Sequence, residues 1–287
     1  MEQVVIIGAG PAGISAALYV KRGGMEPVVI NNGIGALEKA ELIENYYGLS
    51  HPLTGPELFQ TGLDQAKALG IRILETQVLG VEGFDTFEVK TTEGSIEAIS
   101  VILATGGKRK SPAIPGLKEL EGKGVSYCAI CDAFFYRGKE VAILGNGDFA
   151  LHEAETLSHT ASRVTVLTNN VPTAFSSEPA FEVITDPIEA IRGTDALESV
   201  NFAGGGSLAV SGLFVAIGNA GSSEIARQMG AELTDQGHIK VNADMESTIP
   251  GLFAAGDCTG GLLQVAKAVS DGAHAGLSAL KYTRKHV

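Results

Sequence analysis

Near its start the chain has a buried strand, a glycine-rich turn and a helix in immediate succession. The apolar run 4–7 leads into Gly-Ala-Gly-Pro-Ala-Gly at 8–13, and the helix that follows ends at Gly23-Gly24. Another apolar strand comes next, at 28–30. Glycines in such a turn let backbone amides approach a pyrophosphate and let the helix pack closely on the strand. The pattern predicts a dinucleotide-binding βαβ unit and an α/β fold.

The same order occurs a second time in the middle of the chain. Apolar residues 141–144 precede the turn Gly145-Asn146-Gly147-Asp148, a helix is predicted to about residue 158, and a returning strand follows at 164–167. We therefore predict two Rossmann-like domains, each a three-layer α/β unit. Three residues of this turn are candidates for binding a second nucleotide: Gly145, Gly147 and Asp148.

The residues after that returning strand do not suit a nicotinamide coenzyme. A dinucleotide site needs an acid there for a free ribose hydroxyl, or cations for a 2′-phosphate. Thr168-Asn169-Asn170 supplies neither, and no lysine or arginine occurs between Arg163 and Arg192. We expect the second nucleotide fold to be vestigial or atypical.

The inserted region also carries two cysteines followed by an acid, Cys128-Ala129-Ile130-Cys131-Asp132. This spacing allows a small disulfide and favours a reactive thiolate, and Asp132 can carry protons for thiol exchange. Half of a zinc site with His152 and His159 is a weaker interpretation, because their six-residue gap is longer than usual. A structural disulfide is also disfavoured, since the composition does not resemble that of a secreted protein. Cys258 is expected to be a small buried residue.

Composition limits the classes of partner. The chain has 287 residues and a net charge of -12, which argues against nucleic-acid or membrane-surface binding. The two basic runs, Lys108-Arg109-Lys110 and Lys281 with Arg284 and Lys285, are expected to be solvated. The sequence shows neither a signal peptide nor a transmembrane segment, so a cytoplasmic protein is expected.

A third segment, 248–257, is predicted to be an apolar strand that ends at Gly256-Asp257. Asp257 can accept hydrogen bonds from the hydroxyls of a ribityl chain. The alternative is a turn aspartate that caps a helix beginning near Leu262.

The motifs predict one domain inserted into another. The first domain is expected at 1–111 and 219–287, with a hairpin of 87–90 and 96–103, and the inserted domain at 112–218. Residues 111–116 and 218–221 are predicted to form two hinge strands.

Nearly end to end, the chain resembles the low-molecular-weight thioredoxin reductase family of flavoprotein disulfide reductases. The matching stretches are Gly8 to Gly13, Glu44-Asn45-Tyr46, Gly55-Pro56-Glu57-Leu58, Ala104-Thr105-Gly106, Cys128 to Asp132, and Ala255-Gly256-Asp257 with Gln264. The resemblance implies bound FAD, a homodimer, and an inserted domain that rotates to present the dithiol first to flavin and then to thioredoxin.

The resemblance also implies roles for individual residues. Cys131 would face the flavin, Cys128 would attack the partner disulfide, and Asp132 would be the acid-base group. Asn31 and Asn32 occupy the positions at which an acid usually binds the hydroxyls of the ribose. The full set of predicted cofactor residues is Gly8, Gly10, Pro11, Ala12, Gly13, Asn31, Asn32, Asn45, Ala104, Thr105, Gly106, Gly256, Asp257, Gln264 and Val265.

Four departures from the family pattern concern the cofactors. The basic 2′-phosphate motif is replaced by residues 168–170, Phe149 stands where a serine or threonine is usual, and the inserted domain is shortened. The flavin contact is altered at 33–37. These changes make NADPH use doubtful, as in the pyridine-nucleotide-independent branch, in which ferredoxin or another one-electron carrier reduces the flavin.

The leading hypothesis is an FAD-dependent reductase of thioredoxin or a thioredoxin-like protein, with ferredoxin as the donor. Three alternatives stay open: an NADPH-dependent reductase with an atypical nucleotide site, a flavin dithiol oxidase, and a non-catalytic flavoprotein that senses redox state.

Overall fold

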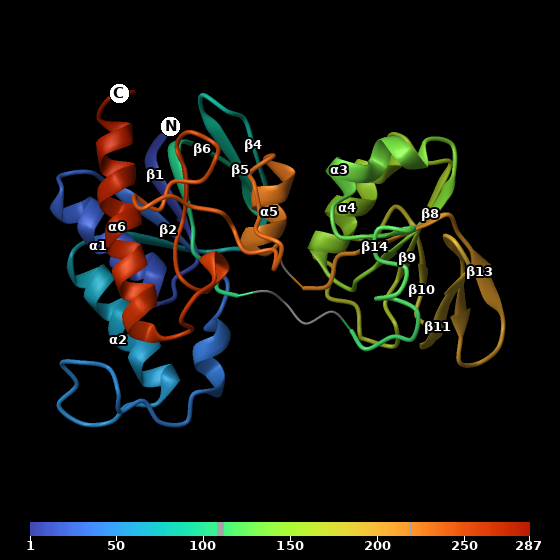
Figure 1. Cartoon of the computed structure of the whole chain (residues 1–287), viewed down its shortest axis with the longest axis horizontal. Coiled ribbons are helices and arrows are strands. Elements are labelled where there is room, and N and C mark those ends of the chain that lie inside the picture. Colours follow the sequence, from blue (N-terminus) through green and yellow to red (C-terminus); the bar gives the residue numbers. More distant parts are fainter. Residues whose placement is uncertain (108–111, 219) are drawn as a thin grey trace. The chain divides into compact units, whose positions relative to one another are not determined.

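The computed structural model describes residues 1–107, 112–218 and 220–287, and these form two compact units (Figure 1). The first unit contains residues 1–107 and 221–287, and the second contains residues 112–218 with Ala220. The basic run Lys108-Arg109-Lys110, together with Ser111 and Asn219 of the predicted hinge strands, lies outside the described residues.

The first unit is built on a seven-stranded sheet. Its strands are β1 (Glu2–Ile7), β2 (Pro27–Asn31), β3 (Arg72–Glu75), β4 (Val78–Glu82), β5 (Phe87–Thr91), β6 (Gly94–Leu103) and β15 (Leu252–Ala254). Its helices are α1 (Pro11–Arg22), α2 (Gly55–Ala68), α5 (Ser222–Gln228) and α6 (Val265–Thr283), with the short 3₁₀ helices η1 (Gly35–Lys39) and η3 (Asp257–Thr259).

The parallel part of this sheet has the strand order β3-β2-β1-β6-β15. The end of β6 pairs with β15, whereas its beginning pairs antiparallel with β5, as the predicted hairpin requires. Because β1 lies in the middle and is covered on both faces, Val4 to Ile7 are buried. The carboxyl ends of five parallel strands therefore meet at one edge of the sheet.

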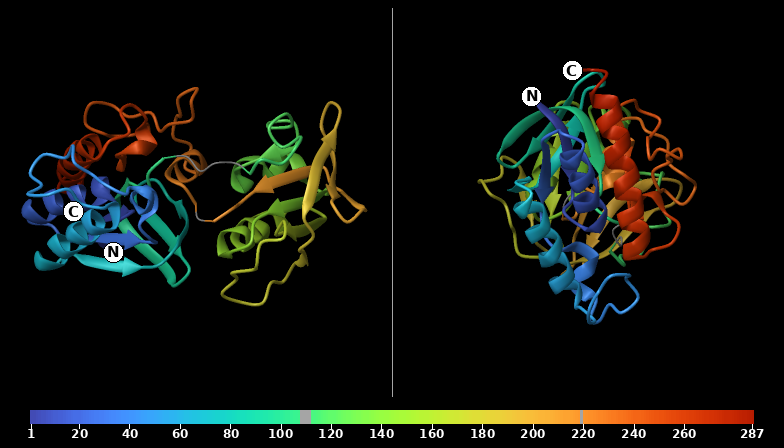
Figure 2. Two further views of the ribbon diagram at one scale, coloured as in Figure 1. Left: turned by 90° about the horizontal axis from the view of Figure 1, so that it is seen from below. Right: turned by 90° about the vertical axis from the view of Figure 1, so that its left-hand side faces the viewer.

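Helix α6 packs along α1 at very short range (Figures 1 and 2). A methyl group at Gly272 would collide with the carbonyl oxygen of Ala12, and one at Gly276 would lie 2.6 Å from that of Ala16. Only glycine permits this approach, since any side chain would force the helices apart. The contact fixes the start of α6 near the start of α1.

The second unit contains a five-stranded parallel sheet, in the order β10-β9-β8-β14-β7, and a three-stranded antiparallel sheet. The parallel strands are β7 (Val125–Ser126), β8 (Glu140–Leu144), β9 (Arg163–Leu167), β10 (Glu182–Ile184) and β14 (Gly212–Val215). The antiparallel strands are β11 (Ile188–Gly193), β12 (Leu197–Phe202) and β13 (Ser207–Ala209). Helical segments are α3 (Ala129–Asp132), η2 (Ala133–Tyr136) and α4 (Asp148–Ser158).

The predicted α/β fold class is confirmed. The segment 248–257, however, differs from the strand that was predicted there. Only Leu252–Ala254 of the expected strand at 248–257 is extended and paired, because β15 meets just the last residues of β6. The helix expected near Leu262 begins at Val265 with Gln264 as its N-cap, so the prediction was three residues early. Asp257 begins η3 and does not cap α6.

Among the described residues, no helix combines the length and the apolar character that spanning a bilayer would require.

The contact between α1 and α6 predicts an unusual result for a glycine-to-alanine change. Alanine is favoured over glycine in helices by about 1 kcal/mol, yet Gly272→Ala should destabilise the protein by about 1–3 kcal/mol, because its methyl group meets the backbone of Ala12. Urea unfolding would measure the change. The exposed His274 on the same helix provides the control, and His274→Ala should stay within about 0.5 kcal/mol of the parent. An unchanged or increased stability in Gly272→Ala would contradict the packing argument.

Candidate active site

The predicted cofactor residues of the first unit lie where parallel strands end. Residues 8–13 follow β1, Asn31 ends β2, residues 104–106 follow β6, and residues 255–257 follow β15. Ligands of open α/β sheets bind at this carboxyl edge. The arrangement gathers segments from both ends of the chain around one site.

The first glycine turn has the geometry of an anion cradle. Gly8 has φ 112°, and a methyl group there or at Gly13 would collide with backbone oxygens of Ala104 or Gly8. Gly10 differs, because a Cβ built on it meets no atom within 4 Å. Gly10 is the N-cap of α1 and Pro11 is the first helical residue, so free amides at this helix start face open space. These residues fit the pyrophosphate of a dinucleotide.

A second loop, Gly256 to Gly260, is held beside this turn by an ion pair. Lys267 Nζ lies 2.7 Å from Asp271 Oδ2 and donates to the carbonyl oxygens of Gly256 and Gly260. Asp271 accepts a hydrogen bond from the Gly256 amide at 3.1 Å. The pair is mostly buried, and its hydrogen bonds tie the loop to α6. Asp257 is thereby fixed at the carboxyl edge, and sequence reasoning missed both residues that fix it.

Two predicted cofactor residues far apart in sequence contact each other. Asn45 Nδ2 donates to Gln264 Oε1 at 3.0 Å. Gln264 is the N-cap of α6 and Val265 is its first residue, so this contact lies at the start of the helix.

An acid from the neighbouring strand β3 lies beside the last residue of β2. Asn31 Nδ2 donates to Glu75 Oε2 at 2.7 Å, and Glu75 ends β3, which pairs with β2. Asn31 Oδ1 is buried without a hydrogen-bond partner in the structure. Asn32, the next residue, is exposed. Glu75 was not predicted, although its place at the end of a strand was a signal that could have identified it.

Thr105 makes a structural link to α5. Its Oγ1 lies 2.7 Å from Ser222 Oγ and accepts the Ser222 amide at 2.8 Å. The carbonyl oxygen of Ala104, the residue before it, lies against Gly8. Gly106, the residue after it, has φ 85°. These three residues therefore form the turn beneath the glycine cradle.

The two cysteines of the second unit form a disulfide, with Cα atoms 5.4 Å apart. Their joining leaves no thiolate for a zinc ion in this state. Cys128 is buried, at 2% exposure, whereas Cys131 is exposed, so a reagent outside the unit meets Cys131 first. Cys128 is the N-cap of α3, and its Sγ accepts the Cys131 amide at 3.2 Å. That contact would stabilise a thiolate on Cys128 once the disulfide opens.

Asp132 is oriented by a buried serine from β7. Ser126 Oγ donates to Asp132 Oδ2 at 2.6 Å and accepts the Cys128 amide at 3.1 Å. One hydroxyl therefore ties the acid to the backbone of the dithiol. Burial, and then the negative charge of Asp132, raises the pKa of the nearby Tyr136. The Ser126 hydroxyl thus fixes Asp132 next to the redox pair, and Ser126 was not found from the sequence.

The dithiol is surrounded by exposed apolar side chains. Ile130 is 49% exposed, and Phe134 and Phe135 are 70% and 66% exposed. The two phenylalanines begin three residues after Cys131 and pack edge to face, with their ring centroids 6.2 Å apart. An apolar patch of this kind is typical of a protein-binding surface.

The second glycine turn has the same construction as the first, but another segment of the chain lies against it. A methyl group at Gly145 would collide with the Ala216 carbonyl oxygen, as one at Gly8 would with that of Ala104. The residues that return after β9, 171–176, are here named the return segment. Three hydrogen bonds join this segment to the turn: Ala174 N to Asn146 O at 2.7 Å, Asn146 Nδ2 to Pro172 O at 2.8 Å, and Ser176 N to Asp148 Oδ1 at 2.8 Å.

Left-handed backbone at Asn169 and Asn170, with φ 52° and 60°, turns the chain back toward this site. Asparagine tolerates that conformation better than most residues. A Cβ built on Gly147 would lie 3.8 Å from the carbonyl oxygen of Ala174, whereas one on Gly10 meets nothing. The turn at 145–148 is therefore covered, and the turn at 8–13 is open.

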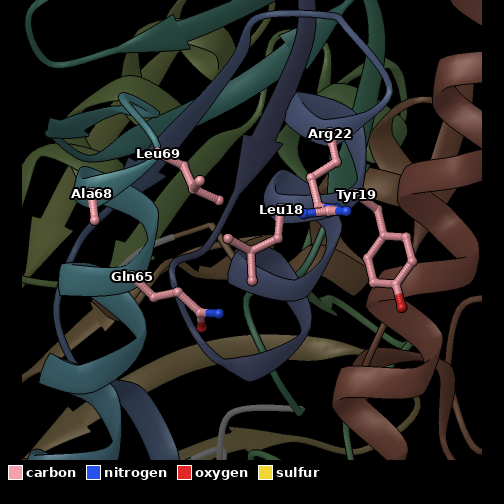
Figure 3. A pocket seen from close by; sticks show the side chains of 6 residues that line it. All are labelled: Leu18, Tyr19, Arg22, Gln65, Ala68 and Leu69. Carbon is pink, nitrogen blue, oxygen red and sulfur yellow. The ribbon is translucent and has the colours of Figure 1, made fainter.

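A separate pocket of about 440 Å³ lies between α1 and α2 (Figure 3). It is lined by Leu18, Tyr19, Arg22, Gln65, Ala68 and Leu69. None of the predicted site residues lines it.

Comparison with known proteins agrees with this geometry. Residues 2–272 match the family model of the pyridine nucleotide-disulphide oxidoreductases. The thioredoxin reductase of Helicobacter pylori (strain J99) is 35% identical over 311 residues, with 100% of each chain covered. The atypical thioredoxin reductase TRi from Desulfovibrio vulgaris Hildenborough gives a TM-score of 0.93 at 37% identity, over 99% of both chains. A ferredoxin-flavin thioredoxin reductase from Clostridium acetobutylicum gives 0.73 at 33%, over 99% of this chain and 98% of that one.

The chain belongs to the thioredoxin reductase family. It is a flavoprotein disulfide reductase, as the combination of a dinucleotide cradle and a vicinal disulfide indicates. The reductase keeps the cradle and the disulfide in separate units, each formed at the carboxyl edge of its own parallel sheet.

The third cysteine of the reductase should be unreactive. Burial raises the pKa of Cys258 to about 12, so about one part in 10,000 is thiolate at pH 8. After reduction of the native protein, iodoacetamide should label Cys128 and Cys131 within minutes and leave Cys258 unlabelled, as peptide mass spectrometry would show. Labelling of Cys258 at a similar rate in the folded protein would show that this site is open to solvent.

Loss of the Ser126 hydroxyl should slow proton transfer at the disulfide. We expect Ser126→Ala to reduce, by about tenfold, the rate at which photoreduced flavin passes electrons to the internal disulfide, because Asp132 loses its anchor. Stopped-flow absorbance across a pH range would measure the rate and its pH profile. Ser211, exposed in the same unit, is the matched control, and Ser211→Ala should leave the rate unchanged. A Ser126→Ala rate within twofold of the parent would rule out the positioning role.

Proposed function

We propose that the reductase uses FAD and the Cys128–Cys131 pair to reduce thioredoxin or a thioredoxin-like protein. We further propose that its electron donor is ferredoxin and not NADPH. The single observation that carries the donor assignment is the return segment, which is hydrogen-bonded to the second glycine turn.

A nicotinamide coenzyme can bind to the second glycine turn only if the space over that turn is free. In a Rossmann unit the pyrophosphate lies against the backbone of the second glycine, which here is Gly147. The Ala174 and Ser176 amides bond to Asn146 and Asp148 on either side of that glycine. Binding a dinucleotide there would require these bonds to break, which costs roughly 0.5–1.5 kcal/mol for each. This cost opposes binding of NADH and NADPH alike.

Charge gives a second argument against NADPH in particular. A 2′-phosphate is bound by arginine or lysine, and neither occurs between Arg163 and Arg192. Arg163 itself pairs with Glu182. One structural relative is a ferredoxin-flavin thioredoxin reductase, which supports ferredoxin as the donor.

The first unit would hold FAD through the open cradle. Gly10, Pro11, Ala12 and Gly13 would receive the pyrophosphate at the start of α1, and Glu75 with Asn31 would bind the adenosine ribose hydroxyls. Asp257 would bind the ribityl chain, and Asn45 and Gln264 would lie beside the ring.

Bound flavin supplies the electron pair that opens the disulfide. Cys131, the exposed sulfur, would meet the flavin, and Cys128 would become the thiolate held by the Cys131 amide. Asp132, hydrogen-bonded by Ser126, would deliver a proton to the Cys131 sulfur, so that the two-electron reduction leaves one thiol, on Cys131, and one thiolate, on Cys128. The Cys128 thiolate would then attack the disulfide of the substrate.

Exposed aromatic residues support a protein as substrate. Phe134 and Phe135 flank the dithiol and offer a hydrophobic surface that a small disulfide would not need. Thioredoxin or a thioredoxin-like protein would dock on these rings, and Ile130 would extend the contact.

Anaerobic titration of the flavoprotein tests the donor. Reduced ferredoxin should bleach the flavin absorbance within seconds, whereas excess NADPH or NADH should leave it unchanged for minutes, because the second turn is covered. Rapid, stoichiometric bleaching by NADPH would refute the donor assignment.

Oxidised thioredoxin provides the substrate arm of the same experiment. Added after ferredoxin, it should restore flavin absorbance in the parent protein but not in Cys128→Ser, because only the parent can form the mixed disulfide and resolve it. Restoration at the parent rate in Cys128→Ser would refute the proposed role of that thiol.

A further inference from the structure

A buried carboxylate contacts the backbone of the redox pair. Glu153 Oε2 accepts the amide of Ala129 at 2.8 Å, and Ala129 lies between the two cysteines. Glu153 is 3% exposed and comes from α4, the helix that follows the second glycine turn. No role for this residue follows from the sequence motifs discussed above.

The position of Glu153 on α4 shows that the contact is specific. The buried face of the helix otherwise carries Phe149, Ala150, Ala154 and Leu157. Glu155, two residues later, is exposed to solvent. A carboxylate on a buried helix face needs hydrogen bonds to offset the cost of burying its charge, and the Ala129 amide supplies one of them.

The charge of Glu153 would act on the reduced dithiol. When the disulfide accepts two electrons, the S–S bond breaks, one sulfur takes up a proton, and the other remains a thiolate. Cys128 Sγ receives the Cys131 amide and is the better placed thiolate. Glu153 bonds to the very next residue, so its negative charge would repel a negative sulfur. Asp132, which directly follows Cys131 and accepts a hydrogen bond from Ser126, adds a second acid.

We propose that Glu153 is a positioning residue that makes the dithiol a stronger reductant. Redox pairs whose thiolate is stabilised are strong oxidants, because the reduced form is favoured. Glu153 acts in the opposite sense: it holds the first turn of α3 in place and disfavours the thiolate. The helix that follows the covered glycine turn thus acts on the dithiol.

The test measures the dithiol equilibrium directly. The holoenzyme is equilibrated anaerobically in glutathione buffers of graded ratio, and Cys128 and Cys131 are quantified by alkylation and mass spectrometry. In Glu153→Gln, which keeps an acceptor oxygen and loses the charge, the equilibrium constant should shift about tenfold toward the dithiol, or about 30 mV upward. The pH dependence of Cys128 alkylation reports formation of the thiolate, and the midpoint of this dependence should move to lower pH.

A matched control and a second variant complete the experiment. Glu155→Gln removes the same charge from the exposed face of α4 and should leave the equilibrium constant unchanged. Glu153→Met, which suits an apolar helix face, should shift the constant in the same direction as Glu153→Gln. A folded Glu153→Gln or Glu153→Met protein with the parent's equilibrium constant would overturn the proposal. Because the readout uses glutathione alone, the result does not depend on the donor or on thioredoxin.

Discussion

Close approach of backbone to backbone is the constraint on which the first unit depends. Side chains are absent at Gly8, Gly13 and Gly272, and a methyl group at any of them would collide with a carbonyl oxygen. These contacts let α1 lie on β1 and let α6 lie on α1. Because α6 is so close, its amino end and the Gly256 loop are brought beside the open turn at Gly10. A cofactor cradle formed from both ends of the chain is the consequence.

The two nucleotide-type units show how the same architecture can be turned to different uses. Both have a parallel sheet, a glycine turn at its carboxyl edge and a helix that begins there. In the first unit the space over the turn is open, and in the second unit the return segment lies against it. The difference arises from a short stretch after β9, where two asparagines adopt left-handed backbone and reverse the chain. The same construction therefore leaves one turn open and the other covered.

The dithiol is held by hydrogen bonds from two residues outside its motif and from one backbone amide within it. Ser126 on β7 holds Asp132, Glu153 on α4 holds the Ala129 amide, and the Cys131 amide holds Cys128. Each contact acts on a different quantity: the position of the acid, the charge near the thiolate, and the stability of that thiolate. Disulfide chemistry in this reductase is therefore set by the second unit's own sheet and helix as much as by the cysteines.

Sequence alone determined the fold class, the two glycine turns, the hairpin and the redox pair, because each depends on local spacing that only a few residue types satisfy. It also indicated the missing cations after β9. Tertiary structure alone decided that Asn31 donates to Glu75, that Lys267 and Asp271 hold the Gly256 loop, and that Glu153 reaches Ala129. These pairs join separate strands and helices, and burial fixes them only when the whole sheet and its helices pack together.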